Sequence, residues 1–452
     1  MHIVLEKIDL NKLIKYILIY TFYKIMLELA YIIGVSYWYG YMGFLYIPNL
    51  CKMVVSYLIL VALVVVIPKD ATKYGTLINF YFSICIIPML SFYWLANRMT
   101  VYVLLVITFF VVMVCSSRVQ IPYQMILNGE NYRYEFVINF IFIIYVFVCI
   151  FMGVKRGGVD SRALSFESIY SLRGEAYSQT ALEGYLINWC TKALFPTLSI
   201  YFVYTKKYTK TIICFVLQIF LYLCYGYKAY LLSAFFGIGL YILEKICWNF
   251  KKKTNLIPTM TFIVLLIPSY FSRMQNIIGK ISFKINNVYA MRMLFEPARI
   301  EYGYFDFFSS EKKLFFSEGL IGKAFDLNYP YDRPIGFVIT NFLNGEDAVS
   351  NANTGILADS YAELGILGIL LIAILSGIMI GLIEKITYDL PIYVVIGILA
   401  YPIVMLNDNP LLTNLLTNGW LIDIFMLLLI EGAVKKNNKY IIQFRGFYEF
   451  RH

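Results

Sequence analysis

Residues 136–154 read FVINFIFIIYVFVCIFMGV, a run of nineteen residues without a charged side chain. A helix needs about 20 predominantly apolar residues to cross the hydrocarbon core of a bilayer. A water-soluble fold has few ways to bury a segment of this length and composition. The run therefore predicts a transmembrane helix, and the rest of the chain follows the same pattern.

Apolar residues make up 60% of the 452-residue chain, mean hydropathy is +0.70, and 15% of residues are charged, against about 25% in soluble domains. No polar block is long enough to form a separate soluble core. We predict an all-α, polytopic integral membrane protein in which residues 1–452 form a single membrane domain. Twelve transmembrane helices are expected near residues 13–35, 50–67, 76–95, 99–115, 136–154, 186–204, 211–225, 229–247, 256–272, 356–383, 391–407 and 411–431.

Lysines gather in two short connecting segments, at 206–210 and 251–253, and in the tail at 435–439. If twelve helices alternate in direction, all three segments fall on one side, which the positive-inside rule assigns to the cytoplasm. Both termini are then cytoplasmic. Lys7, Lys12 and Lys15 precede the first apolar run and no small-residue cleavage site follows it, so this run is expected to be a retained signal anchor.

Two long polar segments fall on the opposite side, a first outer loop at 155–185 and a large outer loop at 273–354. Their sequences contain aromatic residues and little low complexity, which is unlike a flexible linker. We expect the large loop to be partly helical, with a helix over Val288–Phe308, and to fold over the membrane domain.

The composition excludes several kinds of chemistry. The two histidines, His2 and His452, lie at the extreme ends, so neither is placed to act as a base or a metal ligand. The basic residues that produce the net charge of +10 orient helices and do not form a nucleic-acid surface. No CxxC pair occurs, which argues against a zinc site or a disulfide framework, and we expect no metal and no cofactor. The eight cysteines are Cys51, Cys85, Cys115, Cys149, Cys190, Cys214, Cys224 and Cys247.

Basic residues near the predicted outer surface are candidates for binding an anionic lipid headgroup. Arg173 ends the first outer loop and offers a fork of donors to phosphate oxygens, although it can equally pair with Glu175. Lys228 stands in a short outer turn, where basic residues are rare. A diphosphate ligand would explain it, as would a carboxylate partner such as Asp408 or Glu175.

The predicted helix in the large loop carries Arg292, Glu296 and Arg299 at i, i+4 and i+7, on one face. Two arginines arranged in this way can hold two phosphates. An ordinary pair between Arg292 and Glu296 is the alternative.

Asp359 and Glu363 stand four residues apart at the start of the apolar run 356–383. Carboxylates in such a run are costly and commonly functional, and either can accept the proton of an attacking hydroxyl. Their alternative role is to pair with the arginines. Asn351 and Asn353, just before them, are of the type that binds sugar hydroxyls, although asparagine is also common in loops.

These elements, in this order, resemble the Wzy-type polymerases of O-antigen and oligosaccharide repeat units, which belong with the GT-C membrane glycosyltransferases. The similarity covers about residues 165–385. The matching pieces are Leu172-Arg173, GYLINW at 184–189 with Pro196, GYK at 226–228, NANTG at 351–355, and Asp359 and Glu363 with LGILG at 364–368.

The resemblance implies a metal-independent glycosyltransferase in the bacterial cytoplasmic (inner) membrane. It would transfer a growing glycan from a polyprenyl-diphosphate carrier to a lipid-linked repeat unit on the outer side. A chain-length regulator protein is a further partner that such an enzyme would have. Carried over by position, the residues that bind the diphosphate are Arg173, Lys228, Arg292 and Arg299, and the candidates for the general base are Glu363, Asp359 and Glu175.

Two other functions remain open. An O-antigen ligase has a similar plan, but it is expected to have a histidine in the large outer loop, where this chain has none. A flippase for lipid-linked oligosaccharides has a similar number of helices. Transporters commonly place their polar residues at the middle of the bilayer on broken helices, whereas here they concentrate toward the outer face, which favours the polymerase.

Overall fold

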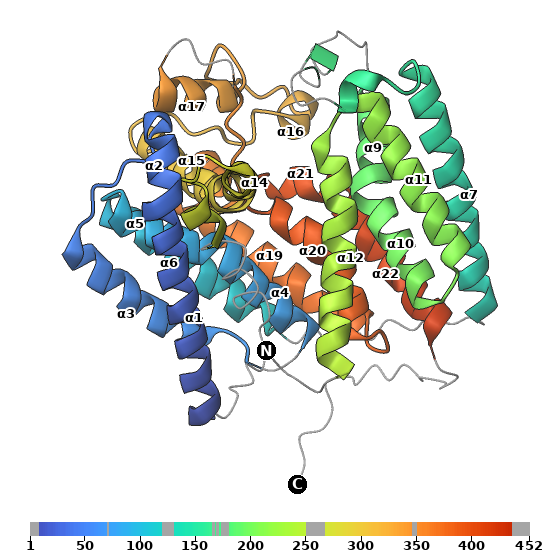
Figure 1. The fold of residues 1–452 in the computed structure, drawn as a ribbon, viewed down its shortest axis with the longest axis horizontal. Helices are drawn as coiled ribbons and strands as arrows, with labels where there is room; N and C mark the ends of the chain where they lie inside the picture. The colour runs from blue at the N-terminus through green and yellow to red at the C-terminus, as the bar shows by residue number, and fades with distance from the viewer. Residues whose placement is uncertain are drawn as a thin grey trace.

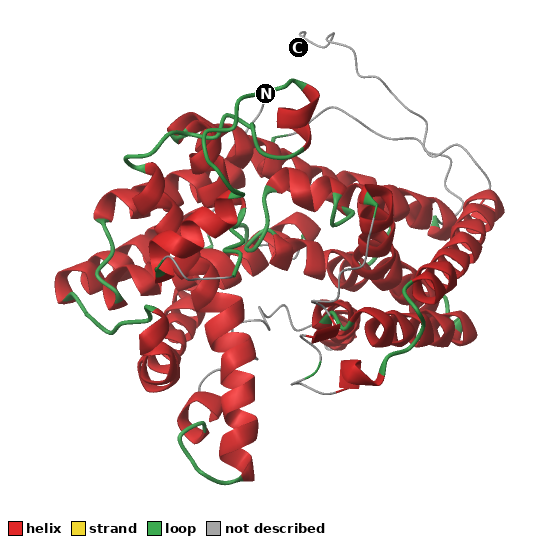
Figure 2. Ribbon diagram, turned by 90° about the horizontal axis from the view of Figure 1, so that it is seen from above, coloured by secondary structure: helices red, strands yellow, loops and turns green. Residues whose placement is uncertain are grey.

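The computed structural model describes residues 9–69, 72–119, 131–164, 168, 171–172, 180–249, 267–345 and 350–435. Throughout these ranges the regular structure is helical, with no strand (Figure 2). The all-α fold class is therefore confirmed. Segments labelled η are π-helical or 3₁₀ turns, several of which continue directly into α-helices.

The first half of the described chain contains two groups of helices, separated by residues outside the described ranges. The first group is α1 (Leu10–Ala30), η1 (Tyr31–Val35), α2 (Ser36–Tyr39), η2 (Gly40–Met42), α3 (Leu50–Val66), α4 (Lys73–Tyr81), η3 (Phe82–Ile86), α5 (Ile87–Leu95) and α6 (Thr100–Ser117). The second is α7 (Asn131–Lys155), η4 (Ser161–Leu164), α9 (Ala181–Asn188), η5 (Trp189–Leu194), α10 (Phe195–Tyr204), α11 (Tyr208–Tyr225) and α12 (Lys228–Asn249).

The second half begins with the helices of the predicted large outer loop, which are α14 (Ile277–Asn286), η6 (Asn287–Phe295), α15 (Glu296–Phe308), α16 (Leu320–Ala324) and α17 (Ile335–Asn344). It ends with α18 (Ile356–Leu364), α19 (Ile366–Ile386), α20 (Ile392–Met405), α21 (Leu411–Leu416) and α22 (Trp420–Val434). In Figure 1, most of α1–α6 lies on the left with α14, α15 and α17, and α7–α12 lie on the right. Between them lie α19–α21, with α16 above α21.

Seven helical segments in the described ranges are long and apolar enough to cross a membrane, and each overlaps a predicted span. They are Leu10–Met42, Lys73–Leu95, Thr100–Ser117, Asn131–Lys155, Tyr208–Tyr225, Lys228–Ile246 and Ile366–Ile386. These helices support a polytopic membrane protein. The count of twelve spans stays a prediction.

The other predicted spans have different outcomes. Residues 50–67 and 391–407 correspond to the shorter apolar helices α3 and α20, and 186–204 lies within the continuous run from α9 to α10. The span at 411–431 is divided into α21 and α22, because Gly419 adopts a left-handed conformation between them (φ +81°). Most of 256–272 lies outside the described residues.

The apolar helix α19 packs closely along α6, and two glycines make the approach possible. A Cβ atom at Gly377 would lie 2.2 Å from the backbone oxygen of Met113, and one at Gly381 would lie 2.3 Å from that of Ser117. Small residues four positions apart let membrane helices bring their backbones together, where van der Waals contacts are most numerous. This contact joins the first group of helices to the C-terminal group.

The predicted large outer loop contributes a helix to the interior of the molecule. The predicted helix over Val288–Phe308 is confirmed as η6 and α15, and α15 packs against α5, α17 and α18. Within it, the hydroxyl of Tyr302 donates to the carbonyl of Met89 (3.2 Å) and that of Tyr304 to the carbonyl of Ala352 (3.1 Å). The loop is therefore part of the folded core.

Candidate active site

The apolar run 356–383, predicted as one span, is broken at Gly365. This residue adopts φ +65° and ψ −139°, a conformation that a residue with a side chain rarely adopts. The break separates the acidic helix α18 from the apolar helix α19 and lets their axes diverge. The predicted span at 356–383 therefore corresponds to α19, while its first nine residues form the separate helix α18. The mean hydropathy of the run does not report this turn.

A short segment of the large loop, residues 314–316, forms hydrogen bonds with the end of α18. The backbone N–H of Leu314 donates to the carbonyl of Ala362 (3.0 Å), that of Phe315 to the carbonyl of Glu363 (3.1 Å), and that of Phe316 to the Glu363 carboxylate. Phe315 and Phe316 have positive φ angles of 51° and 58°. Such conformations cost of order 1–3 kcal/mol each and cluster at functional sites, and here the three hydrogen bonds hold them in place.

Asp359 and Glu363 line one pocket of about 220 Å³ next to this segment. The two carboxyls lie one helical turn apart on α18, as their spacing predicted. The wall beyond them is apolar and comes from α19, a helix long and apolar enough to cross a membrane. The lining residues are Phe316, Asp359, Ser360, Glu363, Leu364, Gly368, Leu371, Ile372, Ile374 and Leu375.

The environment of the two carboxyls favours their neutral forms. Burial raises the pKa of Glu363 to about 7, the N–H of Phe316 acts in the opposite direction, and Glu318 adds a further small increase. Burial, and next the charges of Glu363 and Glu318, raise the pKa of Asp359 well above its usual range. A carboxyl that titrates near neutral pH is suited to exchange protons with a substrate.

No family model, curated protein or solved structure matches this chain.

A third buried carboxyl, that of Glu301 on α15, was not singled out from the sequence. Its side chain is 1% exposed, and no described side chain donates a hydrogen bond to either carboxylate oxygen. Burial raises its pKa well above the usual range. A Cβ atom at Gly355 would lie 2.4 Å from Glu301 Oε1, so the carboxyl faces the start of α18. The available signal was an acid directly before the aromatic sequence YGYF at 302–305.

The two arginines of the predicted helix do not share a face. Arg299 is 3% exposed and its guanidinium donates to Glu296 (3.3 Å) and to Asn344 Oδ1 (3.2 Å). Arg292 is exposed. Prediction of a shared face was wrong because Asn287–Phe295 is π-helical, and a π-helix closes each turn with one more residue than an α-helix. The pair with Glu296 is made by Arg299.

The remaining predicted residues lie in several places. Lys228 begins α12 and is half-buried, while Asn351 and Asn353 are exposed and hydrogen-bonded to each other (3.2 Å). Arg173 and Glu175 lie outside the described residues. In the described ranges Asp359 and Glu363 form no ion pair with an arginine, and no group of three or more histidine, cysteine or acidic residues could hold a metal ion.

Proposed function

We propose that this protein polymerises lipid-linked glycan repeat units at the outer face of a bacterial cytoplasmic membrane. The observation that carries the proposal is the pocket in which Asp359 and Glu363 adjoin an apolar wall from α19. A lipid-linked acceptor has an apolar chain and sugar hydroxyls, and such a pocket offers surfaces for both. The pocket lining contains no basic residue, so it suits the hydroxyl-bearing acceptor better than a diphosphate.

In the proposed reaction, an acceptor hydroxyl attacks the anomeric carbon of the donor glycan. The new glycosidic bond forms as the bond from that carbon to the diphosphate oxygen breaks. The hydroxyl proton passes to a carboxylate, with Glu363 favoured over Asp359 and Glu175 because its pKa is near 7. The diphosphate leaves on its polyprenyl carrier, and basic residues such as Lys228 stabilise its charge.

The arrangement of the helices supports the proposed orientation. The start of α1, the turn between α10 and α11, and the end of α22 lie on the lower side of Figure 1, and α16 and α17 lie on the upper side. The lysines at 206–210 and Lys435 therefore share the lower side, opposite the large loop. In the proposal, twelve spans place this lower side in the cytoplasm.

A proton-coupled flippase is the second candidate, because Glu301 is a buried carboxyl to which no described side chain donates a hydrogen bond. Deletion of the encoding gene distinguishes the two. A polymerase deletion abolishes the ladder of long surface glycans on a gel and retains single repeat units. A flippase deletion removes both and leaves lipid-linked units inside the cell.

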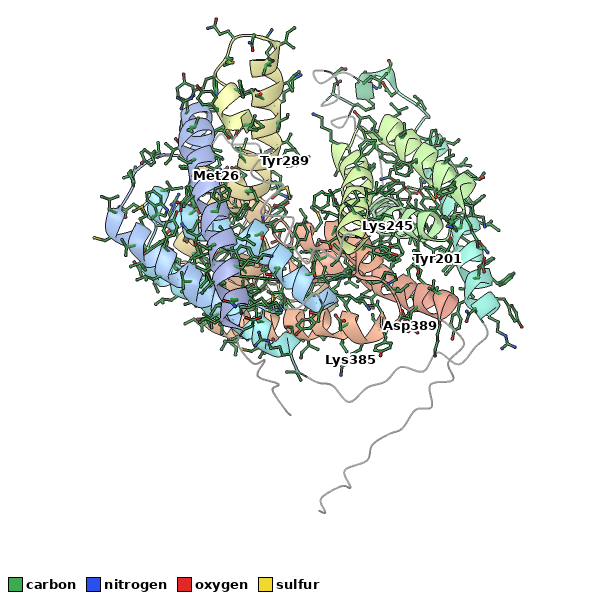
Figure 3. All side chains as sticks on the ribbon, turned by 60° about the horizontal axis from the view of Figure 1, so that its bottom comes forward. Met26, Tyr201, Lys245, Tyr289, Lys385 and Asp389 are labelled. Atoms are coloured by element: carbon green, nitrogen blue, oxygen red, sulfur yellow. The ribbon has the colours of Figure 1, made fainter. Side chains whose placement is uncertain are left out.

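The Lys228→Ala variant is expected to reduce chain elongation by about tenfold or more, because a charged hydrogen bond to an anion contributes roughly 1.5–3 kcal/mol. Single repeat units should persist on the surface. Lys245→Ala is the control, since Lys245 is exposed and lies toward the other end of the same helix, as Figure 3 shows. A normal chain-length distribution for Lys228→Ala would exclude an essential role for this lysine.

Polymerisation is expected to rise with pH through about 7 and then level off, because Glu363 must be ionised to accept a proton. The same shift acts in the opposite direction on stability. The folded state retains this proton above about pH 4.3, where the unfolded chain releases it. Its contribution to stability is therefore full below that pH and is lost as the pH rises through about 7. Initial rates from pH 5.5 to 8.5 test the activity profile, and a flat profile would contradict the assignment of Glu363.

A further inference from the structure

Lys192 is a basic residue inside a long helical run, in the π-helical segment η5 between α9 and α10. Its ammonium donates to Asn418 Oδ1 (2.8 Å). Within the described ranges no carboxylate pairs with it, whereas Lys24, Lys155 and Lys207 each have one. An ammonium has three N–H donors. The charge of a half-buried cation with a single neutral partner is not compensated, and a bound anion can compensate it. π-Helical segments of this kind frequently occur at functional sites.

The start of α22 lies against η5 and brings further donors to the same place. A Cβ atom at Gly419 would lie 2.8 Å from the Cβ of Ala193, so the two segments are in contact. No side chain caps the N-terminus of α22, and the first N–H groups of a helix have no partner within it. The indole N–H of Trp420 is buried, with the residue 1% exposed, and it has no hydrogen-bond partner among the described residues.

Asp423 is the one acid in the first turn of α22. Its Oδ1 accepts a hydrogen bond from the hydroxyl of Thr197 (2.7 Å). Thr197 lies on α10, more than one turn beyond Lys192 along the same helical run. This interaction directs the carboxylate toward α10 and leaves the lysine with its neutral amide partner.

The side chain of Gln218 places Lys192 at the level of the first turns of α12. Its amide nitrogen donates to the carbonyls of Thr191 (3.1 Å) and Tyr230 (2.6 Å), and the hydroxyl of Ser233 also donates to Thr191 (3.0 Å). Lys192 follows Thr191, and Lys228 precedes Tyr230 by two residues. The two lysines therefore lie on neighbouring helices at similar depth.

We propose that Lys192, with the amide of Asn418 and the N-terminal N–H groups of α22, binds a phosphate or diphosphate group. The ligand is an oxyanion because Lys192, the indole N–H of Trp420 and the first N–H groups of α22 are all donors. The acceptors at this place are Asn418 Oδ1, which accepts from Lys192, and the Asp423 carboxylate, whose Oδ1 accepts from Thr197 and whose Oδ2 has no hydrogen-bond partner among the described residues. The assignment of this oxyanion to a polyprenyl-diphosphate carrier rests on the proposed function. Lys192 would then act together with Lys228 from the adjacent helix.

Binding of two probes to the purified full-length protein in detergent tests this site. The probes are inorganic pyrophosphate and farnesyl diphosphate, and both affinity and thermal stabilisation are measured. Lys192→Met is expected to weaken binding by about tenfold or more, and Lys192→Arg to retain most of it. Lys210→Met is the matched control, because Lys210 also donates to an asparagine (Asn139 Oδ1, 2.6 Å) but lies at the start of α11, on the lower side in Figure 1.

The Asn418→Asp variant keeps the lysine bonded and places a carboxylate beside it. It should abolish binding. The substitution also removes the hydrogen bond from Asn418 Nδ2 to Asn414 Oδ1 (2.7 Å), so the melting temperature of each variant is measured alongside its binding. Tighter binding of farnesyl diphosphate than of pyrophosphate identifies a lipid carrier as the ligand, and equal affinities identify a free diphosphate. Unchanged binding of both probes by Lys192→Met and Asn418→Asp would overturn the proposal. Because no polymerisation is measured, this result is independent of the proposed function.

Discussion

The Glu363→Gln variant is expected to lose polymerisation by about 10²- to 10⁴-fold, the range that a positioned general base contributes. Glutamine keeps an acceptor oxygen for the N–H of Phe316 and nearly the same volume, so the segment 314–316 should stay in place. Only the ability to accept a proton is removed. The measurement is the rate of chain elongation with lipid-linked repeat units in reconstituted membranes, together with the melting temperature of the purified protein.

Two further substitutions distinguish the candidates for the general base. Asp359→Asn tests the neighbouring carboxyl in the same pocket, and Glu175→Gln tests the candidate in the predicted first outer loop. If Glu363→Gln elongates at the wild-type rate while one of the others does not, the assignment moves to that residue. If all three variants remain active, the pocket is not the site of proton transfer.

Replacing both Gly377 and Gly381 by leucine is expected to separate α19 from α6. Each Cβ atom would lie within 2.3 Å of a backbone oxygen, and neither backbone can yield without breaking its own helix. Overpacking costs about 1–3 kcal/mol for each site, occasionally more, and the two sites together amount to a large part of a stability of about 5–15 kcal/mol. Loss of the monodisperse peak in detergent and a lowered melting temperature are the expected results.

Gly239→Leu is the control for this prediction. Gly239 also lies in a long apolar helix, α12, but a Cβ atom there would have nothing within 4 Å. Its replacement should leave the melting temperature close to that of the wild type. Equal stability of the double variant and this control would mean that α6 and α19 do not depend on close backbone contact.

The candidate site shows how far local sequence reasoning extends. The spacing of Asp359 and Glu363 was sufficient to predict that they share a helix face, because both lie within one short α-helix and its period is constant. The same reasoning failed for Arg292 and Arg299, since Arg292 lies in a π-helical stretch and Arg299 in the α-helix that follows it. Nothing in the composition of Asn287–Phe295 signals that change of period.

Other residues became candidates only through contacts between distant segments. Glu301 was one acid among several on the predicted helix, and its burial depends on the packing of α15 against α18. Lys192 lies within a predicted span, and its neutral partner Asn418 is 226 residues away in the chain. No local pattern connects residues at such separation.

The sequence by itself determined that the chain is helical and belongs in a membrane, because apolar runs of sufficient length leave the backbone no partner in lipid except its own helix. It also determined that Asp359 and Glu363 lie on the same face of α18. The tertiary structure alone decided that α18 turns away from α19 at Gly365, that Phe316 covers Glu363, and that Lys192 faces Asn418. These features arise from packing between segments that are far apart in the chain. The energy of each contact depends on both segments, so the sequence of one segment alone does not predict it.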